Sequence, residues 1–109
     1  MTRATAQLAE RGEGRCTLSG SLTLETAPWL WRELQSGGLL AAATEVDLAG
    51  VSESDSAGLA LLIAWRACRR RSGGDVEFSG LPQRLRLLAA LTGAEVALQS
   101  APGADAVSA

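Results

Sequence analysis

Hydrophobic and polar positions along this 109-residue chain follow two periods in turn, and the changes from one period to the other mark out its elements. Alternation with a period of two predicts strands over residues 5–11, 15–19, 45–51 and 75–79. Apolar residues spaced by three and four predict helices over residues 26–37, 57–71 and 82–91. We also expect a short closing strand over residues 94–98 and a disordered tail over residues 100–109.

The first helix has recognisable ends. Thr26 is a good N-cap residue, and Gly37-Gly38 can supply a left-handed C-cap. Within this helix Trp29 and Trp31 point in directions about 200° apart, so we expect at least one of the two side chains near the surface.

The order of elements predicts the fold class. Strands that alternate with helices late in the chain pair in parallel through right-handed crossovers, whereas the opening strands form an antiparallel hairpin that turns at Glu13-Gly14. A chain of this length forms one core. We therefore expect a single α/β domain over residues 1–99, with a mixed β-sheet and helices packed mainly on one face.

Composition narrows the range of functions. The net charge is −2 and the sequence pI is about 5.0, so the chain has no overall basic field to attract nucleic acid. The first residues lack the apolar core of a signal peptide, and the longest uncharged stretches are about half the length of a membrane span. The expected location is therefore the cytoplasm, with no membrane span in the chain.

The sequence gives little support for a catalytic site or a metal site. There is no His, and Cys16 and Cys68 are isolated, so the ligands of a tetrahedral zinc site are missing. A serine nucleophile would lack a His or Lys base, and the glycine-rich nucleotide-binding motifs are absent. Nothing singles out carboxylate pairs such as Asp47 and Asp55. We expect a protein that is not an enzyme and that requires no cofactor and no metal.

The second helix is apolar in every direction over its first half, residues 59–65. A surface helix normally has one apolar stripe, whereas here Leu61, Trp65 and Cys68 form a second stripe. Either a neighbouring helix of the same domain or a partner protein covers that stripe. An exposed aromatic and aliphatic patch on a soluble protein usually marks an interface.

Both ends of this helix carry candidate chemistry. Asp55-Ser56-Ala57-Gly58 has the residue types of a helix cap, and a phosphate on Ser56 would meet free backbone N–H groups at the positive end of the helix dipole. The arginines within residues 66–71 have a sufficient explanation in the same dipole, with phosphate or acidic-lipid binding as the alternative.

The segment VDLAGVSESDSAGL, residues 46–59, resembles the signature of STAS domains: a strand of the form hydrophobic-Asp-Leu, a turn, and Asp-Ser/Thr-small-Gly-Leu at a helix start. The resemblance extends over residues 5–98. Its details are most similar to the MlaB-like branch, including the Gly58-Leu-Ala-Leu-Leu62 helix start and Trp31. Ser56, where that branch usually has Thr, is a departure toward the anti-sigma-factor antagonists.

The resemblance implies a function for each branch. An MlaB-like protein is a non-catalytic subunit that binds and regulates the cytoplasmic ATPase of a phospholipid-transporting ABC system, which maintains outer-membrane lipid asymmetry. Such a protein would be peripheral to the inner membrane through its complex. The alternative is an anti-sigma-factor antagonist that is switched by phosphorylation at Ser56.

In the MlaB-like case the resemblance places the contact with the partner at the turn before the second helix and on the helix itself. Ser54, Asp55 and Ser56 would lie in that contact, with Leu61 or Trp65 as apolar anchors.

Overall fold

The computed structural model describes residues 4–98 and contains four strands and five helices in that part of the chain. The strands are β1 (Ala6–Gly12), β2 (Arg15–Leu22), β3 (Glu45–Ser54) and β4 (Glu77–Ser79). The helices are α1 (Ala27–Ser36), α2 (Leu39–Ala42), α3 (Ser56–Arg71), α4 (Gln83–Thr92) and α5 (Glu95–Leu98). The expected tail over residues 100–109 lies outside the described residues.

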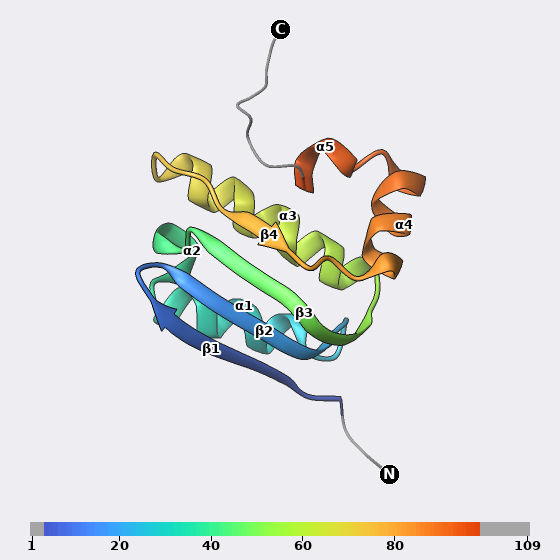
Figure 1. Cartoon of the computed structure of the whole chain (residues 1–109), viewed down its shortest axis with the longest axis horizontal. Coiled ribbons are helices and arrows are strands. Elements are labelled where there is room, and N and C mark those ends of the chain that lie inside the picture. The colour runs from blue at the N-terminus through green and yellow to red at the C-terminus, as the bar shows by residue number, and fades with distance from the viewer. Residues whose placement is uncertain (1–3, 99–109) are drawn as a thin grey trace, which may run out of the picture.

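The four strands form one sheet in the order β1-β2-β3-β4. The β1–β2 hairpin is antiparallel, and β2–β3 and β3–β4 are parallel pairs, so the predicted mixed α/β sheet is confirmed. Alternate side chains of β3 differ sharply in exposure: Val46 and Leu48 are buried, whereas Asp47 is exposed. Figure 1 shows α1 and α3 along the same side of the sheet. Among residues 4–98 the helices therefore pack mainly on one face of the sheet, as expected.

Trp65 lies at the centre of the core and is fully buried. Its indole Nε1 donates a hydrogen bond to the carbonyl oxygen of Leu39 at 3.1 Å, and its ring meets the Phe78 ring edge-on, with centroids 5.8 Å apart. Leu61 is 6% exposed. The second apolar stripe of α3 is thus covered by the domain itself, and the expectation that Leu61 or Trp65 is a surface anchor is wrong.

The physical reason is α2, which packs against both α1 and α3. This helix has only four residues, and it follows a pair of glycines that ends α1: Gly38 has φ 77°, the left-handed conformation that glycine adopts without strain. So short a segment has no measurable hydrophobic period. Its Leu39 is buried and supplies the acceptor for Trp65.

Three other predicted elements differ from the structure. β2 continues to Leu22, three residues beyond its predicted end at Ser19. β3 continues to Ser54, three residues beyond the predicted end, because Ser21 and Leu22 of β2 pair with Glu53 and Ser54 after a shift in register. The predicted strand over residues 94–98 is wrong. Gly93, with φ 76°, caps α4, and the chain turns into α5 against α3 instead of joining the sheet.

The predictions for α1 are confirmed in their main points. Leu30 and Leu34 are buried, Trp31 is half-buried and Trp29 is 40% exposed, so one tryptophan does lie near the surface. Thr26 is the N-cap residue, but its hydroxyl donates to the carbonyl oxygen of Ser21 in β2 and accepts from the amide of Thr23, instead of bonding to a helix amide.

Candidate functional site

The junction of β3 and α3 is held by the carboxylate of Asp55. This residue has an extended backbone (φ −147°, ψ −170°) and is the N-cap of α3. Its Oδ1 accepts hydrogen bonds from the backbone amides of Ala57 at 2.9 Å and Gly58 at 3.1 Å, which would otherwise be unsatisfied at a helix start. Its Oδ2 accepts a third bond, from the amide of Leu24 at 3.1 Å. One side chain therefore joins α3 to the loop between β2 and α1.

Gly58 allows the close approach of α3 to β2. A Cβ at this position would collide with the carbonyl oxygen of Leu22, a backbone atom that cannot move aside cheaply. The amide of Asp55 also donates to that same oxygen, at 3.3 Å. The first turn of α3 is therefore fixed against the end of β2 by both main-chain and side-chain contacts.

Ser54 connects the junction to α4. It is 8% exposed, and its carbonyl oxygen accepts a hydrogen bond from Nε of Arg84 at 2.9 Å. This hydrogen bond brings the start of α4 to the β3–α3 junction. Arg84 was not predicted as a site residue, and its role depends on a contact across 30 positions of the chain.

Ser56 is the first residue of α3, and its side chain is exposed. Asp55 supplies the cap, so the hydroxyl of Ser56 is not needed for it. The structure thus brings Ser54, Asp55 and Ser56 together at one surface but separates them from Leu61 and Trp65, which lie in the core.

A groove of about 540 Å³ lies beside this junction. It is lined by residues of the β2–α1 loop, the end of β3 and the start of α4, namely Thr23, Leu24, Glu25, Ser52, Glu53, Ser54, Asp55, Pro82 and Arg84. The side chain of Leu24 is 71% exposed at this groove. Sequence reasoning missed the loop, although an apolar residue outside both hydrophobic periods was a signal that could have identified it.

The chemistry of the junction favours contact over catalysis. Both oxygens of Asp55 already accept amide hydrogen bonds, so this carboxylate is engaged in holding the backbone and is poorly placed to take a proton from Ser56. Within residues 4–98, no three Asp, Glu or Cys side chains gather into a cluster suited to a metal ion. No helix in this part of the chain combines the length and hydropathy that a membrane span requires.

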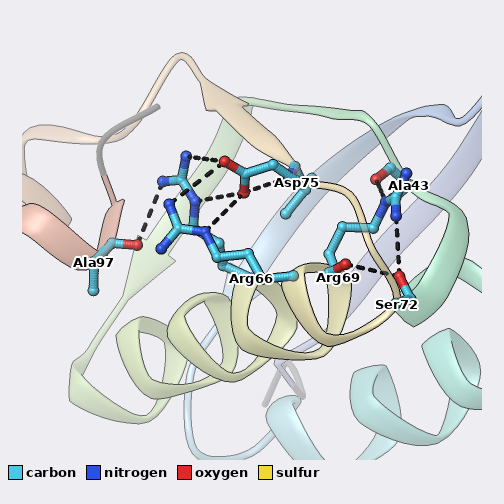
Figure 2. A network of polar contacts seen from close by, with 8 residues as sticks. Ala43, Arg66, Arg69, Ser72, Asp75 and Ala97 are labelled. Atoms are coloured by element: carbon cyan, nitrogen blue, oxygen red, sulfur yellow. Dashed lines mark hydrogen bonds and ion pairs between the residues drawn. The ribbon is translucent and has the colours of Figure 1, made fainter. Parts of the chain in front are cut away.

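The arginines at the other end of α3 form a structural network (Figure 2). Arg66 is 1% exposed, and its guanidinium binds the Asp75 carboxylate with Nε–Oδ1 and Nη2–Oδ2 distances of 2.9 and 3.3 Å. It also donates to the carbonyl oxygen of Ala97 at 3.4 Å. Arg69 donates to the carbonyl oxygen of Ala43 at 2.7 Å. These contacts explain two of the four arginines without a bound lipid or phosphate.

The pKa of Asp75 reflects this network. Burial alone would raise it, but hydrogen bonds from Arg66, the Val76 amide and Arg70, together with the charge of Arg66, outweigh the burial and lower the pKa to about 2. The carboxylate therefore stays ionised and paired throughout the physiological range.

The Cys16 thiol is poorly suited to act as a nucleophile. It is buried in the core, and burial, reinforced by the charge of Glu10, raises its pKa to about 11. A thiol with so high a pKa stays protonated and unreactive.

Comparison with known proteins identifies the family. Residues 6–100 match the family model described as "Mlab, STAS domain", which covers most of the chain, including the whole β1–β4 sheet and the β3–α3 junction. No significantly similar sequence was found among curated proteins. The mixed sheet, the helices on one face and the Asp-capped helix start all agree with that match, and the chain therefore belongs to the MlaB-type STAS domain family.

Proposed function

We propose that this chain is a non-catalytic subunit that binds and regulates the cytoplasmic ATPase of a phospholipid-transporting ABC system, one that maintains outer-membrane lipid asymmetry. The family match supports this proposal, because the resemblance to the MlaB-like branch implies a domain that acts by binding a partner protein. Its place in the cell would be the cytoplasmic side of the inner membrane, reached through the complex.

The observation that carries the proposal is the construction of the β3–α3 junction. Ser56 is exposed on a backbone that is fixed by the hydrogen bonds of Asp55, and the exposed Leu24 is fixed to the same carboxylate. A partner that docks here meets a surface already ordered, so little conformational entropy is lost on binding. The core of α3, including Trp65, supports this surface from below without contributing to it.

The direct test is binding between the purified chain and the ATPase subunit of the phospholipid-transporting ABC system of the same genome. We expect Ser56→Asp to weaken binding by about tenfold and Ser56→Ala by less, because a new charge in a docked surface costs more than a lost hydroxyl. Ser36→Asp is the matched control, because it adds the same charge at an exposed serine, the last residue of α1. Full binding by both Ser56 variants would exclude this junction as the contact.

A second candidate is an anti-sigma-factor antagonist switched by phosphorylation. The specific observation in its favour is the exposed hydroxyl of Ser56 at the first position of α3, open to a kinase. Incubation with the kinase of a neighbouring gene and ATP, followed by intact-mass measurement, tests this function. A mass gain of one phosphate that Ser56→Ala abolishes would favour it over the transporter subunit.

A further inference from the structure

We propose that the groove beside the β3–α3 junction receives a basic side chain, Arg or Lys, from the protein partner, while Leu24 packs against an apolar part of the same partner. This inference rests on the proposed function, since it specifies the chemistry of the partner's docking surface. It assigns a binding role to Glu25, which lies outside the segment that resembles the family signature, and to Glu53, which lies within that segment.

The charges that line the groove are unbalanced. It contains three carboxylates, those of Glu25, Glu53 and Asp55, against the single guanidinium of Arg84. Arg84 is directed to the carbonyl oxygen of Ser54, and among residues 4–98 neither Glu25 nor Glu53 forms an ion pair. A cation brought by a partner would meet complementary potential there, which raises both association rate and specificity.

The position of Glu53 is fixed in advance. Its Oε1 accepts a hydrogen bond of 2.9 Å from the hydroxyl of Ser21, which is itself 6% exposed. The two residues are also paired in register across β2 and β3. A carboxylate held by a buried hydroxyl loses little side-chain entropy when it binds a partner, unlike a freely rotating surface glutamate.

Glu25 lies between two hollows. Besides the groove at the junction, it lines a second depression of about 520 Å³ together with Trp29, Arg32 and the start of β1. The exposed apolar side chain of Leu24 thus shares the first hollow with Glu25, and that of Trp29 shares the second. Apolar side chains grouped beside a carboxylate that has no ion pair are typical of a docking surface, whereas single scattered apolar residues are not.

The lining also contains an unsatisfied polar atom. Among the described residues, the hydroxyl oxygen of Thr23 is the buried side-chain polar atom that has no hydrogen-bond partner. Thr23 lines the groove next to Glu25, and such an atom normally finds a partner. Because this oxygen is buried, an N–H donor seated between Glu25 and Glu53 would reach it only after the Thr23 side chain had rotated toward the groove.

The test is a charge reversal with a matched control. The double variant Glu25→Lys/Glu53→Lys is compared with Glu33→Lys/Glu77→Lys, which makes the same change in net charge at exposed positions of α1 and β4. Binding to the ATPase subunit is measured by calorimetry. We expect the groove variant to bind about a hundredfold more weakly than the wild-type protein, and the control variant to bind within about threefold of it.

Salt dependence gives a second readout. Binding of the wild-type chain should weaken between about 0.05 and 0.5 M NaCl, because exposed ion pairs are screened over this range. The neutral variant Glu25→Gln/Glu53→Gln, which keeps the shape of the groove, should lose most of that dependence. It also replaces the reversal variant if that one fails to fold, which thermal melting would reveal.

The outcomes separate the two proposals. Wild-type chain that does not bind the ATPase overturns the proposed function and this inference with it. A second outcome overturns this inference alone. In it the wild-type chain binds, the groove and control reversal variants weaken binding equally, and Glu25→Gln/Glu53→Gln keeps the salt dependence of the wild-type chain. Restoration of binding to Glu25→Lys/Glu53→Lys by a single Arg→Glu or Lys→Glu change in the ATPase would identify the basic residue itself.

Discussion

The two ends of α3 are each fixed by an aspartate, but the two carboxylates bind different kinds of donor. At the N-terminal end Asp55 accepts hydrogen bonds from three backbone amides and leaves the neighbouring side chains exposed. At the C-terminal end Asp75 binds the side chains of Arg66 and Arg70, so these charged side chains are already engaged in contacts within the domain. Where Asp55 binds the main chain, the neighbouring side chains stay free to contact a partner. Where Asp75 binds arginine side chains, those side chains are already engaged.

The largest expected effect is that of Gly58→Ala at the N-terminal end. The added methyl group collides with the Leu22 carbonyl oxygen, and α3 must move away from β2. We expect a loss of about 3 kcal/mol in the free energy of unfolding, measured by urea denaturation. Ala60→Gly, an exposed change in the same helix, should cost only about 1 kcal/mol. Equal midpoints for Gly58→Ala and the wild-type protein would show that the ends of β2 and α3 are less closely packed than described.

At the C-terminal end, Asp75→Asn should cost about 2–3 kcal/mol. Asn keeps the shape but removes the charge, and the buried guanidinium of Arg66 loses its counter-ion. Arg70→Ala, which removes the half-exposed partner of the same carboxylate, should cost less than about 1 kcal/mol. Similar costs for the two variants, in paired denaturation curves, would mean that the network does not centre on Arg66.

Substitutions of Asp55 at the N-terminal end of α3 should show whether its hydrogen-bond geometry or its charge stabilises the fold. Asp55→Ala removes the acceptors of three amides and should cost about 1–2 kcal/mol. Asp55→Asn keeps the Oδ1 acceptor, and Asn is as good an N-cap as Asp, but its amide NH2 cannot accept from the Leu24 amide, so the change should cost about 1 kcal/mol. If Asn is as damaging here as at position 75, charge rather than amide capping fixes both ends.

The last prediction concerns acid. The pKa of Asp75 is lowered from 3.8 to about 2, so its contribution to stability is present above about pH 4 and is lost as the pH falls through 2. For this partly exposed carboxyl we expect a contribution of about 1 kcal/mol. The difference in unfolding free energy between wild type and Asp75→Asn, measured from pH 5 to pH 2, should therefore shrink by that amount. A constant difference would exclude ionisation of Asp75 as its source.

The order of the main elements could be predicted from the sequence because each has a clear hydrophobic period over seven or more residues, or strong breakers at its ends. α2 and α5 could not, since each is four residues long. Residues 95–98 are a short and mostly apolar run that fits a strand or a helix, and only Gly93 and the packing against α3 decide for a helix. The burial of Trp65 depends on α2, so it could not be predicted without that helix.

The site divides in a similar way. Asp55 and Ser56 could be predicted because a helix cap is a local feature of sequence. The groove could not, because it requires Glu53 of β3 to meet Ser21 of β2, and the register of these strands shifts twice along their length. Arg84 arrives from a separate helix. The local half of the site is therefore visible in the sequence, and the half that depends on strand register is not.

The three-way attachment of Asp55 also has a kinetic consequence. The amides of Leu24, Ala57 and Gly58 share one acceptor group, although more than thirty residues separate the first from the others. In hydrogen–deuterium exchange these amides should open together as one cooperative unit and become more protected together when a partner binds. A loop and a helix start that are distant in sequence thus respond to a ligand as a single local folding unit.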